Sequence, residues 1–223
     1  MGSFLIANYK LERKAEQREI YSLFEGTDIL NGQKVFIKIF SPESSVSAET
    51  LFKFPFLMHP NILPILDAGY LREKKIYIIF PQINGIPILS CFEKAHNNFI
   101  SIAFQLANSL AFLHHLGIIH KKISLNNLIL TPDGKLILAD LDFCCSISNK
   151  NKGLGGSSSY IKPRMLEEKE NYDYKSDLYA AGIVLFQLYT GKKIEKNFSY
   201  SLLIKRLSAI KDLHIRSLSL IHI

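Results

Sequence analysis

One lysine on a predicted strand is the clearest candidate for chemistry in this sequence. Lys38 lies in residues 34–40, a run that alternates polar and apolar in part. A lysine on a rigid strand can hold phosphate oxygens as a point charge, although a single strand lysine is more often a solvated surface residue. Cys91, Cys144 and Cys145 lack metal-ligand spacing, and we interpret them as reduced thiols in a cytoplasmic protein.

The composition is that of a globular chain. Its 223 residues include 27 basic and 20 acidic side chains, which gives a net charge of +7, and 48% of the residues are hydrophobic. These values exclude a disordered chain and allow a sizeable core. The 12 glycines and 3 cysteines exclude collagen and a disulfide-stapled miniprotein.

The charge and the apolar runs limit the partners that we expect. The basic residues are scattered and carry no RNA- or DNA-binding motif, so a nucleic-acid-binding protein is the weakest of three hypotheses and we expect no nucleic acid. The most apolar stretch, residues 178–189, contains Gln187 and is too short to span a bilayer. We therefore expect no membrane segment in this chain.

The first third of the sequence reads as strands that position Lys38. Asn31-Gly32 predicts a hairpin turn before residues 34–40, because both residues tolerate positive φ. Residues 76–80 predict a second, nearly apolar strand. Residues 47–54 form a weak helix candidate that ends at Pro55.

The rest of the sequence is mostly helical. A stripe at helical spacing predicts one long helix, with its apolar face at Ile100, Ala103, Phe104, Ala107, Leu110 and Ala111. Asp133-Gly134 predicts a hairpin, and residues 142–159 a mobile loop. Residues 178–189 predict a buried helix, with Asp177 as a plausible N-cap and Gly191 beyond its end.

Short motifs in chain order resemble one family. They are Phe36-Ile37-Lys38, His59-Pro60-Asn61-Ile62, the eight residues from His120 to Asn127, and Asp140-Leu141-Asp142. In this order they resemble the VAIK, HPNI, HRDLKPEN and DFG motifs of the eukaryotic-type protein kinase superfamily. The resemblance implies an α+β, bilobal fold with a small β-rich N-lobe at residues 1–83 and a larger, partial α-helical C-lobe at residues 84–217.

The resemblance also implies a site for ATP and magnesium. Lys38 would face the phosphates, whereas Asn127 and Asp140 would hold the metal ion. Four further residues fall where the family surrounds the adenine, namely Ile20, Phe36, Ile83 and Ile129. Phe80 falls at the gatekeeper position. Asp177 matches the aspartate that holds the backbone of the catalytic loop, a role compatible with an N-cap.

Several residues depart from the family pattern. Lys122 stands in place of the aspartate that accepts the substrate proton, and an ammonium group cannot accept a proton. Loss of a positioned base typically costs about 10²- to 10⁴-fold in rate. The phosphate-loop glycines would fall at Arg13, Ala15 and Arg18, where side chains block the approach of backbone N–H groups. Arg13 and Arg18 offer a charge-based alternative for phosphate.

Phe36 is the bulkiest departure. The family has a small alanine there, above the adenine, so a phenylalanine fills part of the nucleotide pocket. Either the ring rotates aside, or Ile20 and Ile129 enclose it as a filled core. Overpacking a fitted site costs on the order of 1–3 kcal/mol. We therefore expect ATP and magnesium binding to be weak or absent.

Other assignments stay open at this point. Glu49 is nearest the place of the glutamate that pairs with the strand lysine, but an exposed surface glutamate is the alternative. Asp142-Phe143-Cys144 is a second frame for DFG. Arg164 reverses the charge of a structural glutamate in the family. Residues 218–223 look like a translated sequencing adapter, so we expect a truncated domain with a non-native tail.

Two hypotheses follow from the resemblance. The first is a pseudokinase, a regulatory or scaffolding module that binds a protein partner through its shape, because Lys122, Phe36 and the missing glycines disfavour catalysis. The second is an active Ser/Thr kinase that phosphorylates protein substrates. Lys38, Asn127 and Asp140 are retained, and phosphoryl transfer depends largely on positioning and electrostatics.

Overall fold

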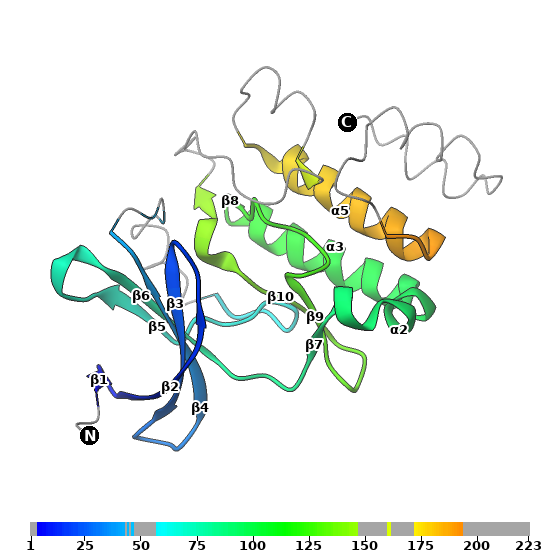
Figure 1. Ribbon diagram of the computed structural model, residues 1–223. Helices are drawn as coiled ribbons and strands as arrows, with labels where there is room; N and C mark the ends of the chain where they lie inside the picture. The colour runs from blue at the N-terminus through cyan, green and yellow to red at the C-terminus, as the bar shows by residue number, and fades with distance from the viewer. Residues whose placement is uncertain are drawn as a thin grey trace.

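A six-stranded antiparallel sheet forms the N-terminal part of the chain, and among the described residues that follow it are the helices α2, α3 and α5 (Figure 1). The computed structural model describes residues 4–42, 44, 46, 57–146, 160–161 and 172–193. The strands of the sheet, in spatial order, are β1 (Leu5–Ile6), β2 (Tyr9–Gln17), β3 (Tyr21–Asp28), β4 (Lys34–Phe40), β6 (Ile76–Pro81) and β5 (Asp67–Tyr70).

The turn between β3 and β4 fixes the register around Lys38. Gly32 has a φ of 75°, as the Asn-Gly pair predicts. The register then places Leu23 on β3 and Ile78 on β6 opposite Lys38. Because side chains alternate along a strand, Val35 and Ile37 face one side of the sheet, and Lys38 shares the other side with Phe40.

The second part contains three α-helices among the described residues and two small sheets. The helices are α2 (Phe92–Asn97), α3 (Phe99–His115) and α5 (Tyr174–Thr190). One sheet has the order β10 (Leu136–Leu138), β9 (Leu128–Leu130), β7 (Ile86–Pro87), and the other pairs β11 (Cys145–Ser146) with β8 (Ile118–Ile119). Short 3-10 helices cover Arg72–Lys74 (η2), Ile88–Cys91 (η3) and Leu141–Phe143 (η4). This arrangement confirms the predicted α+β, bilobal architecture.

One apolar core joins the two parts. Phe40 and Ile78 of the large sheet belong to the same buried cluster as Leu106 of α3 and Val184 of α5. The connection between the parts runs from the end of β6 at Pro81 to the start of β7 at Ile86. The predicted lobe boundary at residue 83 falls within this connection. The predicted helix at 47–54 and the tail at 218–223 lie outside the described residues.

The helix α3 exists as predicted, but only part of its predicted apolar face is buried, with Leu110 in the core. Ile100 and Phe104 are 76% and 68% exposed, and they belong to the stripe that was expected to be buried. The residues that pack into the core are Ile102, Leu106, Leu110 and Leu113. Both stripes are apolar and helically spaced, so periodicity alone did not distinguish them. Gly117 follows the helix with a φ of 72°.

The helix α5 begins four residues earlier than predicted, and its N-cap is not Asp177. Asp173 caps it by accepting a hydrogen bond from the backbone N–H of Ser176, whose hydroxyl accepts one from the Asp173 N–H in return. Gly191 ends the helix with a φ of 66°, as predicted. The first residues of the predicted loop 142–159 are ordered, because η4 and β11 continue to Ser146.

Candidate functional site

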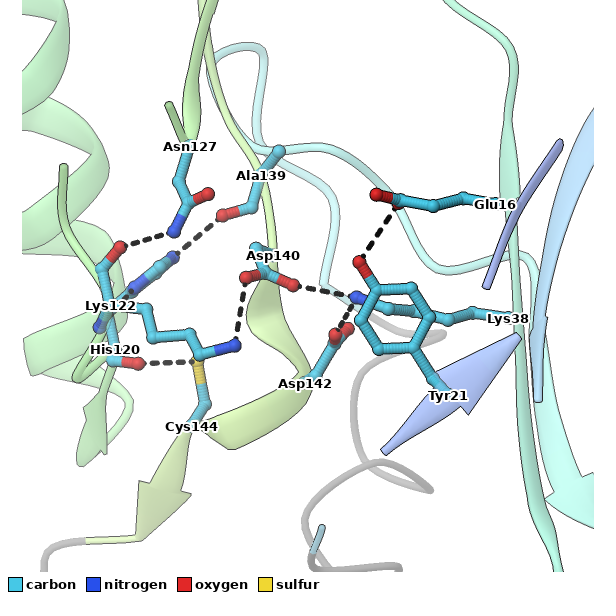
Figure 2. A network of polar contacts seen from close by, with 10 residues as sticks. All are labelled: Glu16, Tyr21, Lys38, His120, Lys122, Asn127, Ala139, Asp140, Asp142 and Cys144. Carbon is cyan, nitrogen blue, oxygen red and sulfur yellow. Dashed lines mark hydrogen bonds and ion pairs between the residues drawn. The ribbon is translucent and has the colours of Figure 1, made fainter. Parts of the chain in front are cut away.

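Four charged side chains from distant parts of the sequence meet between the large sheet and the helical part (Figure 2). Lys38 extends from β4, and Lys122 from the segment that follows β8. Asp140 and Asp142 come from the segment after β10, where η4 begins. The structure thus brings together three of the predicted site residues and adds Asp142.

Asp140 lies between two ammonium groups. Its Oδ1 is 2.9 Å from Lys38 Nζ, and its Oδ2 is 3.1 Å from Lys122 Nζ. Burial opposes ionisation of this carboxyl group, but the two lysines outweigh it and hold its pKa well below the usual range. Asp140 also adopts a left-handed backbone conformation, with a φ of 66°, which aspartate tolerates better than most residues.

Asp142 is a second, fully buried carboxyl group at Lys38. Its Oδ2 forms an ion pair with Lys38 Nζ. Burial raises the pKa of Asp142 to about 7, with the neighbouring Asp140 charge adding to this effect. For Lys38, burial lowers the pKa, but the two carboxylates overcome burial and raise it above its ordinary value.

The two frames considered for DFG differ in these contacts. Asp140 contacts both lysines, whereas Asp142 contacts Lys38. Both aspartates therefore contact Lys38, and the frame that starts at Asp140 stays a prediction. Glu49, the candidate partner of Lys38, lies outside the described residues, and so does Arg164.

Tyr21 covers Lys38 from the side of β3. The Lys38 ammonium is 4.2 Å from the centroid of the Tyr21 ring, a cation–π contact. The Tyr21 hydroxyl donates to Glu16 Oε2 at 3.2 Å, which fixes the ring over the lysine (Figure 2). No sequence motif points to Tyr21, but the register from the Asn31-Gly32 turn pairs it with Phe40, on the Lys38 side of the sheet.

The residues predicted for the phosphate loop lie on the β2–β3 hairpin. Ile20, predicted beside the adenine, lies just before β3 and is 36% exposed, and the register places Leu23 opposite Lys38. Arg13 and Arg18 are mostly exposed, and each forms an ion pair with a glutamate of the same hairpin. The register of β2 and β3 has two irregularities that the glycine count did not anticipate.

The segment that carries Lys122 is fixed by Asp177. The Asp177 carboxylate accepts hydrogen bonds from the backbone N–H groups of His120 and Lys121 at 2.8 and 2.9 Å. His114 Nε2 lies 2.9 Å from the same carboxylate. This geometry is the backbone-holding role expected for Asp177. Because Asp177 is 1% exposed, these bonds are shielded from water.

His120 and Asn127 complete the support of this segment. The His120 ring is fully buried between the Lys122 N–H, which donates to Nδ1 at 3.2 Å, and the carbonyl of Ala139, 3.1 Å from Nε2. These partners fit the neutral ring with its proton on Nε2, and burial lowers the pKa of His120. Asn127 Nδ2 donates to the Lys122 carbonyl at 2.7 Å.

Three of the residues predicted around the adenine, Phe36, Ile83 and Ile129, lie in one aromatic and aliphatic group with Phe80. The rings of Phe36 and Phe80 are 5.8 Å apart between centroids. Phe80, Ile83 and Ile129 pack against the same small buried cluster, formed by Leu63, Ile137 and Ala139. A side chain at Gly85 would approach Ile129 to 2.6 Å, so the connection between the two parts requires glycine there.

The ammonium groups at Asp140 oppose the binding of a divalent cation there. Each oxygen of Asp140 is hydrogen-bonded to a lysine. Asn127 holds the Lys122 carbonyl through its amide N–H, a bond that does not involve the Oδ1 through which an asparagine binds metal. Among the residues that the structure describes, no group of three or more His, Cys, Asp or Glu side chains could hold a metal ion. A divalent ion would have to displace a lysine from Asp140.

The raised pKa of Asp142 predicts a specific dependence of stability on pH. In the folded state its carboxyl group holds a proton up to about pH 7, whereas the ordinary value is 3.8. The folded state therefore binds more protons over this window, and the resulting stabilisation is lost as pH rises through about 7. Urea unfolding should show that stability, relative to Asp142→Asn, falls between about pH 4 and pH 7. A rise over the same window would contradict the assignment.

Comparisons with known proteins agree with this architecture. The family model described as the protein kinase domain matches residues 22–217. A protein of Acanthamoeba polyphaga mimivirus whose name describes a serine/threonine-protein kinase is 27% identical over 211 residues, covering 85% of this chain and 75% of that protein. The Aurora kinase of Schizosaccharomyces pombe is 31% identical over 167 residues, covering 72% of this chain and 46% of that kinase.

A solved structure is similar in fold. The PK-1 kinase of the Cydia pomonella Granulovirus superposes with a TM-score of 0.72 at 18% identity, covering 91% of this chain and 80% of that one. The chain spans about a third of a Clostridium acetobutylicum relative that is 26% identical to it. In the part of the chain that the structure describes, no helix has the length and apolar character needed to cross a bilayer.

Proposed function

Because the chain belongs to the protein kinase domain family, we propose that it is a degenerate member, a pseudokinase that acts as a regulatory or scaffolding module for a protein partner. The observation that carries this proposal is the ion pair between Lys122 and Asp140. It joins the residue at the position of the proton acceptor to the carboxylate that the family uses for the metal ion. The module would be cytoplasmic and would bind ATP weakly or not at all.

The charge at Lys122 opposes catalysis directly. An ammonium group cannot take the proton of a substrate hydroxyl, and Lys122 is held by its bond to Asp140. Loss of the base alone lowers a rate by about 10²- to 10⁴-fold. Because both Asp140 oxygens are engaged by lysines, this carboxylate is also hindered from holding a metal ion. In kinases the positioning of the phosphates depends on that ion.

The surroundings of Lys38 oppose nucleotide binding. Tyr21 lies against its ammonium group, and Asp142 pairs with it from the other part of the chain. A phosphate group would have to displace these partners. Phe36 packs against Phe80 at the position of the adenine.

We further propose the lobe division at residues 1–83 and 84–217, with residues 218–223 as a non-native tail.

The second candidate is an active Ser/Thr kinase with protein substrates. The proximity of Lys38 and Asp140, at 2.9 Å, favours it, because these two residues would hold the phosphates and the metal ion of ATP. This candidate requires Lys122 to leave Asp140 when Mg-ATP binds. Two relatives whose names describe Ser/Thr kinases, from the mimivirus and from Clostridium acetobutylicum, support this alternative.

Nucleotide binding and phosphate transfer decide between the two. With about 5 mM Mg-ATP we expect the melting temperature to rise by less than about 1 °C. A ligand raises the stability of the folded state appreciably only when its concentration exceeds its Kd. Phe36→Ala should enlarge this shift by opening the adenine position. Phe104→Ala, which removes an exposed ring on α3, is the matched control. Transfer of radiolabelled phosphate with Mg²⁺ or Mn²⁺, abolished by Asp140→Ala, would reject the pseudokinase.

A further inference from the structure

We propose that the Lys122 ammonium takes the place of a divalent cation at Asp140, so that this site carries its counter-ion within the chain and binds no metal. The inference rests on the proposed function, because it concerns the same degenerate site. Lys122 both replaces the lost base and supplies at Asp140 a positive charge that a kinase takes from solution as a metal ion.

The carboxylate of Asp140 has its two oxygens engaged by nitrogen atoms of the chain. Lys38 Nζ is 2.9 Å from Oδ1, and Lys122 Nζ is 3.1 Å from Oδ2. A metal ion at either oxygen would sit against an ammonium group, and the like charges would repel each other in a largely buried site. The cluster of two lysines and two aspartates is balanced in formal charge before any ion is added.

The side chain of Lys122 is positioned by its surroundings. Its ammonium group is 3.7 Å from the centroid of the Phe143 ring. Its backbone N–H donates to His120 Nδ1, and its carbonyl accepts from Asn127 Nδ2. Asn127, the second residue predicted to hold metal, therefore fixes Lys122 in place. The side chain of Lys122 is 18% exposed, so water competes little for the ammonium group.

Lys121 provides a matched control at the neighbouring position. Its ammonium group is 5.0 Å from the centroid of the Tyr172 ring, whereas that of Lys122 is bonded to Asp140. A lysine-to-aspartate substitution changes the formal charge of the chain by the same amount at either position, but only at Lys122 does it remove a partner of Asp140. We expect Lys122→Asp to place a carboxylate beside Asp140, whereas Lys121→Asp should leave Asp140 paired with both lysines.

The test is a titration of the full chain with Mn²⁺, followed by electron paramagnetic resonance of the free ion. We expect the wild-type chain and Lys121→Asp to bind Mn²⁺ no tighter than about 1 mM, and Lys122→Asp to bind at least about tenfold tighter, because affinity for hard cations follows the number of charged oxygen ligands. Lys122→Met keeps the apolar stem and removes the charge. It serves as a second variant whose affinity should also rise, by less.

Two results would overturn the inference. One is a wild-type Mn²⁺ site that Asp140→Asn abolishes, and the other is a folded Lys122→Asp or Lys122→Met protein, checked by circular dichroism, with no gain in affinity. The phosphate-transfer assay separates this inference from the proposed function. Transfer without Mn²⁺ binding would refute the function alone, and Mn²⁺ binding without transfer would refute the inference alone.

Discussion

Asp177→Ala should lower the free energy of unfolding by about 3–5 kcal/mol, because it leaves several buried donors without an acceptor. Asp177 is 1% exposed and accepts from the backbone N–H groups of His120 and Lys121. The backbone donors cannot turn toward water. Since a domain of this size is stable by only about 5–15 kcal/mol, the variant would be marginal. Urea unfolding of the full chain measures the change.

Asp173→Ala is the matched control for this prediction. Asp173 is on the same helix, four residues earlier, and caps its N-terminus through the Ser176 N–H. Loss of an N-cap costs about 1 kcal/mol. If the two variants lost the same free energy of unfolding, Asp177 would contribute to the helix alone and would not anchor the segment that carries Lys122.

This pair also illustrates what the sequence could and could not predict. The two aspartates lie within one turn of the start of α5, and either has the chemistry of an N-cap. The residue type did not decide between them. The structure does, because Asp177 faces a loop more than 50 residues away in sequence, at His120 and Lys121. The resemblance to the kinase family had pointed to that role.

The charged site likewise combines residues that the sequence predicted with one contact that it could not predict. Lys38, Lys122 and Asp140 were predicted as motif positions, and the structure places Asp140 at 2.9 Å from the Lys38 ammonium and at 3.1 Å from the Lys122 ammonium. The ion pair of Lys38 with Asp142 was not predicted. It joins residues 104 positions apart, and no local pattern reports which of two nearby carboxyl groups will turn toward a distant lysine.

Strand register decides what the sequence pattern left open on β3. The placement of Ile20 beside the adenine, from a count of glycine positions, stays a prediction. Pairing with β4 places Leu23 opposite Lys38 and Tyr21 opposite Phe40. A shift along a strand changes which side chains share a face. On α3, two apolar stripes competed, and the one that packs against the core contains Leu106 and Leu113. Burial against other elements is a tertiary property that periodicity does not contain.

Lys38→Met should also lower the free energy of unfolding by about 3–5 kcal/mol near pH 8, because it leaves the buried Asp142 carboxylate without its ammonium partner. In a kinase whose lysine serves the nucleotide alone, the same change would affect ATP binding with little effect on the fold. Lys34→Met, on the same strand but with an exposed ion pair to Glu12, is the control and should change stability far less.

The dependence on pH and a second substitution identify the cause. Burial and Asp140 already raise the pKa of Asp142 to about 7, and removal of the ammonium group raises it further. Below the new pKa the carboxyl group is neutral, so Lys38→Met should cost less at pH 5 than at pH 8. Asp142→Asn, added to Lys38→Met, should recover most of the loss at pH 8, because it removes the unpaired charge. A loss that is equal at both pH values and that Asp142→Asn does not relieve would mean that Lys38 stabilises the fold through packing with Tyr21 and Phe40 instead.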